Sequence, residues 1–251
     1  MSIKASFFGA FFGAVLLLGA SITPSSAYVL YPTSSPGKWG PAAFGTGATV
    51  TWSLMGDGVD LSGESAGISV ALSSFMPTGF ETAVMGAFDA WAAIADLTFL
   101  QVTDFGEAFN APQQSGDIRL GGHAFDGQNG VLAHAYLAPS NGISAAGDIH
   151  FDTAENWKIG FSGAGFDIFQ ITAHEIGHAI GLDHTTVAAS LMNQFYTEAF
   201  SGPQADDIAG AQFIYGANLS AVPLPAALPL FGSAIAMIGF VGLRRKRKAT
   251  V

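Results

Sequence analysis

The sequence predicts an α+β fold in which a mixed, twisted five-stranded sheet is packed against three helices. Short segments rich in β-branched and aromatic residues, such as 48–54, lie between Gly-rich and Asp-rich loops, as strands do. Longer segments repeat their apolar residues at helical spacing, most clearly 77–95 and 166–180. Because strand-like and helical segments occur in one chain without an internal repeat, we expect a layered α+β domain with a small helical lower part.

The individual elements are expected in the following order. Residues 28–47 are rich in Pro, Ser and Gly and form an extended lead-in, and residues 56–67 form a loop. Between 77 and 95 the residues Phe80, Val84 and Phe88 lie on one helical face, which we expect to be core. The predicted strands are 48–54, 97–102, 117–120, 131–137 and 148–151, and the predicted helices are 77–95, 166–180 and 204–215.

The two ends of the chain predict export. Lys4, an apolar run over 7–20 and the small residues before Ala27 are typical of a secretory signal peptide, residues 1–27. The alternative is an amino-terminal membrane anchor, for which the run is short. We therefore expect a main domain over 28–218 and a carboxy-terminal tail over 219–251.

The tail contains a second apolar segment. Residues 226–243 are long enough to span a bilayer, and the basic cluster 244–248 that follows would remain on the cytoplasmic side. A plain single-span membrane anchor is one interpretation. The string VPLPA at 222–226, the span and the basic end together resemble the Pro-Glu-Pro-type (PEP-CTERM) sorting tails of Gram-negative bacteria. This resemblance implies an exosortase-type processing enzyme as a partner and a cell-surface or extracellular location.

Charge and cysteine content restrict the function further. Residues 28–218 contain three Lys or Arg and all 19 Asp and Glu, which gives a net charge of −16 with His neutral. Such a domain repels phosphate backbones, so nucleic acid is excluded as a partner. Cysteine is absent, so the domain must be held by its core and by metals rather than by disulfides. We expect a monomer.

Residues 174–184, HEIGHAIGLDH, predict a catalytic metal site. His174 and His178 are four residues apart and therefore lie on one face of a helix, where two imidazoles can share a zinc ion. Gly181 lets the chain turn sharply, so that His184 can become the third ligand and leave a fourth position open. Glu175 lies next to the first ligand, where it can act as a general base. A chance His-Glu-x-x-His on a surface helix is the alternative, but it would not require the third His or the Gly.

This motif resembles the extended zinc signature of the metzincin metalloproteases, and its exact residues resemble the matrixin branch. Ser190-Leu191-Met192-Asn193 resembles the Met-turn beneath the metal, and residues 204–216 resemble the last catalytic-domain helix of matrixins. The resemblance extends over about residues 28–216. It implies a metzincin-type catalytic domain with a zinc cleft between an upper and a lower part. It also implies a zinc endopeptidase of protein or peptide substrates, in which a zinc-activated water attacks the peptide bond.

The resemblance implies two further metal sites. Matrixins bind a structural zinc through three His and one Asp; His134 and His150 match two of these positions, and His123 matches a third. The family's His-x-Asp is replaced here by His123-Ala124-Phe125, which leaves the fourth ligand unassigned. The alternative is that these His cap strands or form hydrogen bonds in the core. A structural calcium site is implied for side chains or carbonyl groups of Asp126, Gly127, Asn129, Val131, Asp152 and Glu155, for which solvated surface acids are the alternative.

The same resemblance places the substrate. An extended peptide would pair with the edge strand that includes Leu132 and Ala133. A specificity pocket would lie between Leu132, the zinc helix and the wall segment 193–196, where Tyr196 matches the family's wall Tyr and Gln194 replaces a common Pro. The competing hypothesis is a non-catalytic cell-surface or extracellular-matrix binding protein that uses the metals only for stability. Glu175 favours the enzyme, because a protein without activity has no need of a carboxylate between two ligands.

Overall fold

The computed structural model describes residues 27–31, 37–64, 66–112, 114–139 and 144–219. A five-stranded sheet forms the centre of the domain, with strand order β3-β2-β4-β6-β5. Strands β2, β3, β4 and β6 are parallel to one another, and β5 is antiparallel at the edge. The predicted mixed sheet is therefore confirmed. Its strands are β2 (Ala48–Leu54), β3 (Leu97–Gln101), β4 (Ile118–His123), β5 (Ala133–Ala135) and β6 (Ile149–Asp152).

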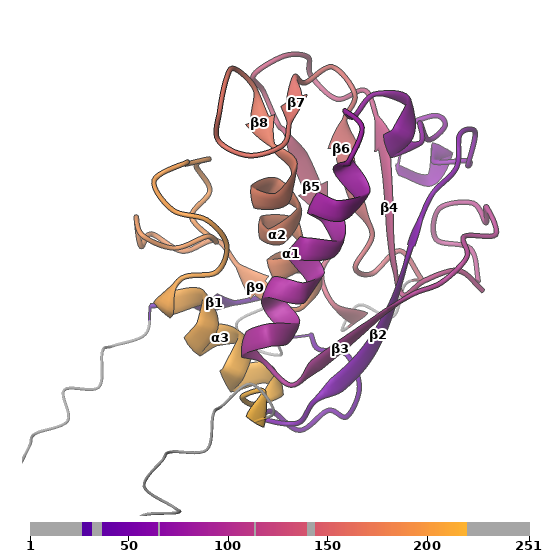
Figure 1. Cartoon of the computed structure of the whole chain (residues 1–251). Coiled ribbons are helices and arrows are strands. Elements are labelled where there is room, and N and C mark those ends of the chain that lie inside the picture. Colours follow the sequence, from indigo (N-terminus) through magenta and orange to yellow (C-terminus); the bar gives the residue numbers. More distant parts are fainter. Residues whose placement is uncertain (1–26, 32–36, 65, 113, 140–143, 220–251) are drawn as a thin grey trace, which may run out of the picture.

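In the described part of the chain, three α-helices accompany the sheet, as predicted (Figure 1). Helices α1 (Phe80–Ile94) and α2 (Ile168–Ala179) pack side by side in front of the sheet. Helix α3 (Ala205–Tyr215) lies below them, next to the small sheet formed by β1 (Val29–Leu30) and β9 (Leu182–Asp183). A third small sheet joins β7 (Trp157–Lys158) to β8 (Phe166–Asp167).

The core lies between the sheet and the two packed helices. The ring of Phe88 in α1 stacks on Trp52 of β2 at 4.6 Å between centroids. Trp91, fully buried in α1, donates its ring N–H to the carbonyl of Ala173 in α2 at 2.9 Å. This hydrogen bond fixes α1 against the helix that carries the predicted metal-binding residues His174 and His178. The apolar face predicted for residues 77–95 is thus the face that positions the site.

Four elements differ from the sequence prediction by two or more residues at one end or at both. Helix α1 begins at Phe80 rather than at Pro77, because Gly79 adopts φ +95° immediately before it and cannot belong to the helix. Strand β4 continues three residues past Leu120, because it lies between β2 and β6 and is buried along its whole length. Strand β5 has only three residues, since it pairs with β6 alone. Helix α2 begins at Ile168 rather than at Phe166, because Phe166 and Asp167 pair with β7 and the Asp167 side chain caps the helix by accepting from Gln170 N–H at 2.8 Å.

Within the described residues, no helix is both long and apolar enough to cross a membrane. The predicted signal peptide, except Ala27, and the predicted tail segment 226–243 lie outside the described residues. Both remain predictions, as do the domain boundaries at 28 and 218.

Candidate metal centres

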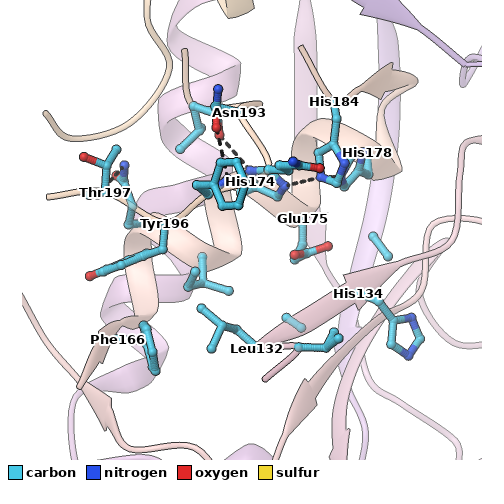
Figure 2. A pocket seen from close by; sticks show the side chains of 18 of the residues that line it. Leu132, His134, Phe166, His174, Glu175, His178, His184, Asn193, Tyr196 and Thr197 are labelled. Atoms are coloured by element: carbon cyan, nitrogen blue, oxygen red, sulfur yellow. Dashed lines mark hydrogen bonds between the residues drawn. The ribbon is translucent and has the colours of Figure 1, made fainter. Parts of the chain in front are cut away.

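Helix α2 and the turn after it bring three imidazoles together at one point (Figure 2). His174 and His178 project from the same face of α2. Gly181 then adopts φ +106°, a conformation that favours glycine, and a Cβ at this position would lie 2.4 Å from the carbonyl oxygen of Gly37. The chain therefore turns tightly into β9, and His184 faces the helix. Its Nε2 lies 3.2 Å from Nε2 of His174 and 3.2 Å from Nε2 of His178.

These distances fit a tetrahedral zinc ion. With Zn–N bonds of about 2.0–2.1 Å, the ligand atoms of such an ion lie about 3.3 Å apart. The ring orientation fits as well: Nδ1 of His174 is 2.7 Å from the carbonyl oxygen of Leu191, and Nδ1 of His178 is 2.9 Å from that of Leu182. When Nδ1–H donates to a carbonyl, Nε2 carries the lone pair, and here it points toward the common centre.

Burial keeps these imidazoles in the neutral form that binds metal. It lowers the pKa of His174 to about 3 and that of His178 to about 4, and it lowers the pKa of His184 as well. Protonated imidazoles could not bind a cation, so this environment suits a metal site.

Glu175 lies beside the triad, on the side of the cleft that faces the strand segment with Leu132 (Figure 2). Its carboxylate is buried, and Oε2 has no hydrogen-bond partner. Burial raises the pKa of Glu175 to about 8. A buried carboxylate oxygen without a partner is costly, which is typical of a group that serves a reaction rather than the fold.

The segment beneath the triad is held by Asp207 of α3. Its carboxylate accepts from the hydroxyl of Ser190 and from the backbone N–H of Leu191 at 2.7 Å and of Met192 at 3.1 Å. Met192 is buried below α2, so close that a Cβ on Gly177 would lie 2.2 Å from its Sδ. Because the Leu191 carbonyl also orients His174, Asp207 supports the triad indirectly. Met192 as the floor beneath a bound metal remains a prediction, and the role of Asp207 was not predicted.

A cavity of about 790 Å³ opens in front of the triad. Leu132, Ala133 and Tyr196, the predicted substrate-binding residues, all line it. Tyr196 packs edge-on against Phe166 at 5.2 Å between ring centroids, and its hydroxyl donates to Glu198 at 2.7 Å. Glu198 in turn pairs with Lys158 at 2.7 Å. The wall segment is thus held in place by an ion pair that the sequence did not predict.

Comparison with known proteins identifies the family of this domain. A model of the peptidase M10 family, described as Matrixin, matches residues 68–216, which is more than half of the chain. The chain belongs to the matrixin family. The predicted α+β fold with its five-stranded mixed sheet and three helices is therefore the fold of a matrixin domain.

Several individual matrixins are similar to the same region of the chain. Karilysin from Tannerella forsythia is 36% identical over 144 residues, which cover 57% of this chain and 30% of karilysin. Stromelysin-3 from Xenopus laevis is 36% identical over 55% of this chain and 28% of its own length. Matrix metalloproteinase-20 from Homo sapiens is 37% identical over 59% of this chain and 30% of its own length. The matched region thus spans less than a third of these relatives.

A second cluster lies behind the edge of the sheet, where His134 points away from the triad of His174, His178 and His184 (Figure 2). His123, His134 and His150, the three candidates for a structural zinc, come together there with Glu64. Burial raises the pKa of Glu64, but its close contacts with the three His outweigh burial and hold that pKa well below its usual range. Glu64 was not a predicted ligand. Nothing in its local sequence marks it, because the contact joins residues 59 positions apart or more.

The predicted calcium residues lie around one loop. Asp126 accepts from Val131 N–H at 3.0 Å, and Glu155 accepts from Gly130 N–H at 3.2 Å. Asn129 and Gly127 have positive φ values of 64° and 94°, which curl the loop. Oδ2 of the buried Asp152 has no hydrogen-bond partner. Unlike the two His clusters, these carboxylates do not form a group whose ligand atoms all lie within 4.8 Å of one another, so calcium remains a prediction.

Proposed function

We propose that this matrixin is an exported zinc metalloendopeptidase. The observation that carries the proposal is the convergence of His174, His178 and His184 beside a buried, unpaired Glu175 carboxylate at the base of an open cleft. Three neutral ligands and one open position are the arrangement of a catalytic rather than a closed structural zinc site. Membership of the matrixin family supports the same activity.

The residues of the cleft have distinct roles in the proposed reaction. When bound, zinc supplies a Lewis acid that polarises the scissile carbonyl and makes the attacking water more acidic. Glu175 accepts a proton from that water as the new C–O bond forms, and it donates the proton to the amine as the C–N bond breaks. A dication next to Glu175 favours its ionised form, which offsets the effect of burial on its pKa.

The substrate is proposed to bind as an extended strand. Among the described strands, β5 pairs only with β6, so its other edge is available to a peptide lying in the cleft. Leu132, Phe166 and Tyr196 form an apolar recess next to the triad. We expect this recess to accept the hydrophobic side chain that follows the cleaved bond.

Calcium and export complete the proposal. The unpaired Oδ2 of Asp152, next to Asp126, Glu155 and the curled loop 126–131, supports a structural calcium ion. The sequence patterns of residues 1–27 and 219–251 support export and a membrane-associated sorting tail that an exosortase-type enzyme would process. A non-catalytic binding protein is not favoured, because it gives no reason for Glu175 to be buried without a partner.

One experiment tests the proposed activity. The wild-type protein should cleave casein, lose the activity with a chelator and regain it with zinc. Glu175→Gln should retain zinc and reduce the cleavage rate by at least about 10³-fold, because the general base is lost. Glu81→Gln, an exposed change on α1, is the matched control and should cleave normally. A peptide library should show a hydrophobic preference after the cleaved bond.

Full activity in Glu175→Gln would exclude the proposed role of this residue. A wild-type protein that binds zinc but cleaves neither casein nor any library peptide would favour the non-catalytic alternative.

A further inference from the structure

The second His cluster contains a ligand that the matrixin pattern does not supply. Oε1 of Glu64 lies 2.7 Å from Nε2 of His134 and 3.2 Å from Nε2 of His123. Its other oxygen, Oε2, lies 2.7 Å from Nδ1 of His150. One atom from each of the four residues lies within 4.8 Å of the others. The carboxylate is therefore at the centre of three imidazoles.

Hydrogen bonding accounts for the contacts of His123 only if both of its ring nitrogens carry a proton, and it does not account for the contact of His150. Nδ1 of His150 and Oε2 of Glu64 are both buried and approach each other closely, yet neither makes a hydrogen bond of acceptable geometry. Nδ1 of His123 lies 3.0 Å from the Ala124 carbonyl. If Nδ1–H donates to that carbonyl, a neutral His123 ring directs an Nε2 lone pair at a carboxylate oxygen, and a cation that both atoms bind would remove this repulsion.

The donor set identifies the class of cation. Three imidazole nitrogens and one carboxylate oxygen form a four-ligand set that suits a structural zinc ion. Calcium and magnesium prefer oxygen ligands and larger coordination numbers, so they are poor candidates here. The set leaves no open position, in contrast to the triad in the cleft.

Three of the four ligands come from the sheet, and the fourth comes from a segment outside it. His123, His134 and His150 come from β4, β5 and β6, and His134 lies directly opposite His150 in the sheet register. Glu64 comes from a short 3-10 helix, Ser62–Glu64, which is not part of the sheet. It lies four residues before the start of the region that matches the Matrixin model, at residue 68.

The turn that follows His123 cannot supply the fourth ligand instead. Ala124 and Phe125 have no ligating side chain, and the carboxylate of Asp126 is used by its own loop, where it accepts from Val131 N–H. Glu64 thus supplies the fourth ligand that the segment after His123 lacks. Its loop reaches the sheet through a bridge between Val70 and Gly122 and through a small apolar cluster of Met55, Val59 and Leu61.

We propose that Glu64, together with His123, His134 and His150, binds a structural zinc ion, and that this ion clamps the 56–70 loop onto the edge of the sheet. With Glu64 as the fourth ligand, the ion links the sheet to the loop that precedes β4 instead of to the segment between β4 and β5. The inference concerns a site separate from the catalytic triad and does not depend on peptidase activity.

Zinc content and loop protection in the full-length protein test this proposal. After dialysis against dilute zinc, wild type and Glu81→Gln should each hold about two zinc ions per chain, and Glu64→Gln about one. Loss of a direct ligand should weaken the second site at least about 100-fold. Limited proteolysis with mapped cut sites should show faster cleavage within residues 56–70 in Glu64→Gln, and also in wild type treated with a chelator.

Two outcomes would overturn the proposal. In one, Glu64→Gln retains the second zinc with wild-type affinity; in the other, it loses the zinc but the loop is cut at the wild-type rate. If Glu64→Gln does not fold, Glu64→Asp replaces it, because it keeps the charge but withdraws the carboxylate by one methylene. Glu64→Asp should then bind the second zinc more weakly, and unchanged binding would contradict the inference. Casein cleavage, measured separately, reports the catalytic site and does not enter this test.

Discussion

At the scale of single residues, Gly177 is the position in α2 where the helix packs most tightly against Met192. A Cβ at this position would lie 2.2 Å from Sδ of Met192 and 3.2 Å from the ring of Trp91. Gly177→Ala should therefore lower the free energy of unfolding by about 1–3 kcal/mol, the usual cost of overpacking a core. This cost exceeds the gain of up to about 1 kcal/mol that Ala brings to a helix interior. Urea unfolding would measure the change.

Gly86 provides the matched control for this prediction. It lies in the interior of α1, and a Cβ there would meet only the ring of Phe169 at 3.6 Å, an ordinary contact. Gly86→Ala should be neutral or stabilising by up to about 1 kcal/mol, because only the helix preference of Ala acts. Equal effects of the two substitutions would show that Met192 and α2 are not packed as tightly as described.

The residue scale also shows what the sequence could reveal about the sites. His174, Glu175, His178 and His184 lie within one short segment, so the local geometry of a helix and a turn was sufficient to group them. Glu64 could not be found in this way. Its position depends on how a loop packs over β4 and β6, and a tertiary contact of that kind leaves no periodic pattern in the sequence.

At the scale of elements, the link between α3 and the segment beneath the triad rests on Asp207. This carboxylate accepts from Ser190, Leu191 and Met192 and also from the N–H of Gln204 at 2.7 Å. Asp207→Asn replaces one acceptor oxygen by a donor, which leaves buried N–H groups without partners. We expect a loss of about 2–4 kcal/mol in unfolding free energy. Catalytic zinc affinity should fall about 10–100-fold, because the Leu191 carbonyl orients His174.

Calorimetry and zinc titration would measure these two effects. Asp89→Asn, an exposed change on α1, is the matched control and should alter neither. Normal zinc affinity in a destabilised Asp207→Asn would show that the segment supports the fold without orienting His174.

The bounds of an element were predicted well where the local sequence determines them and poorly where tertiary contacts do. Strand β2 was predicted to the residue, because its alternating pattern is regular and Gly lies on both sides of it. Helix α1 was predicted to within one residue at its end, but it begins three residues later than predicted, at Phe80. The ends of β4, β5 and α2 were wrong by two or more residues. Their limits depend on which strand lies next to them, as with β8, which pairs with β7 and takes residues from the predicted helix. Strand pairing of this kind depends on contacts between distant segments and cannot be predicted from the local sequence.

At the scale of the whole molecule, we expect negative charge to oppose folding and the proposed metal ions to counteract it. The 28–218 region carries a net charge of −16 before any cation binds. Self-repulsion should destabilise the compact state most at low ionic strength, where the screening length is about 30 Å at 0.01 M salt and about 10 Å at 0.1 M. Raising NaCl between these concentrations should therefore increase the melting temperature.

The increase should be larger for the metal-free protein than for the protein loaded with zinc and calcium, because bound dications already reduce the net charge. Differential scanning fluorimetry at both salt concentrations, with and without metals, would measure it. Glu81→Lys makes the charge less negative by two units at an exposed position on α1, so it should reduce the salt dependence of the metal-free form. If the melting temperature of the metal-free protein did not respond to salt or to Glu81→Lys, long-range repulsion would be negligible. The stability gained on metal binding would then come from local contacts at the His clusters and the 126–131 loop alone.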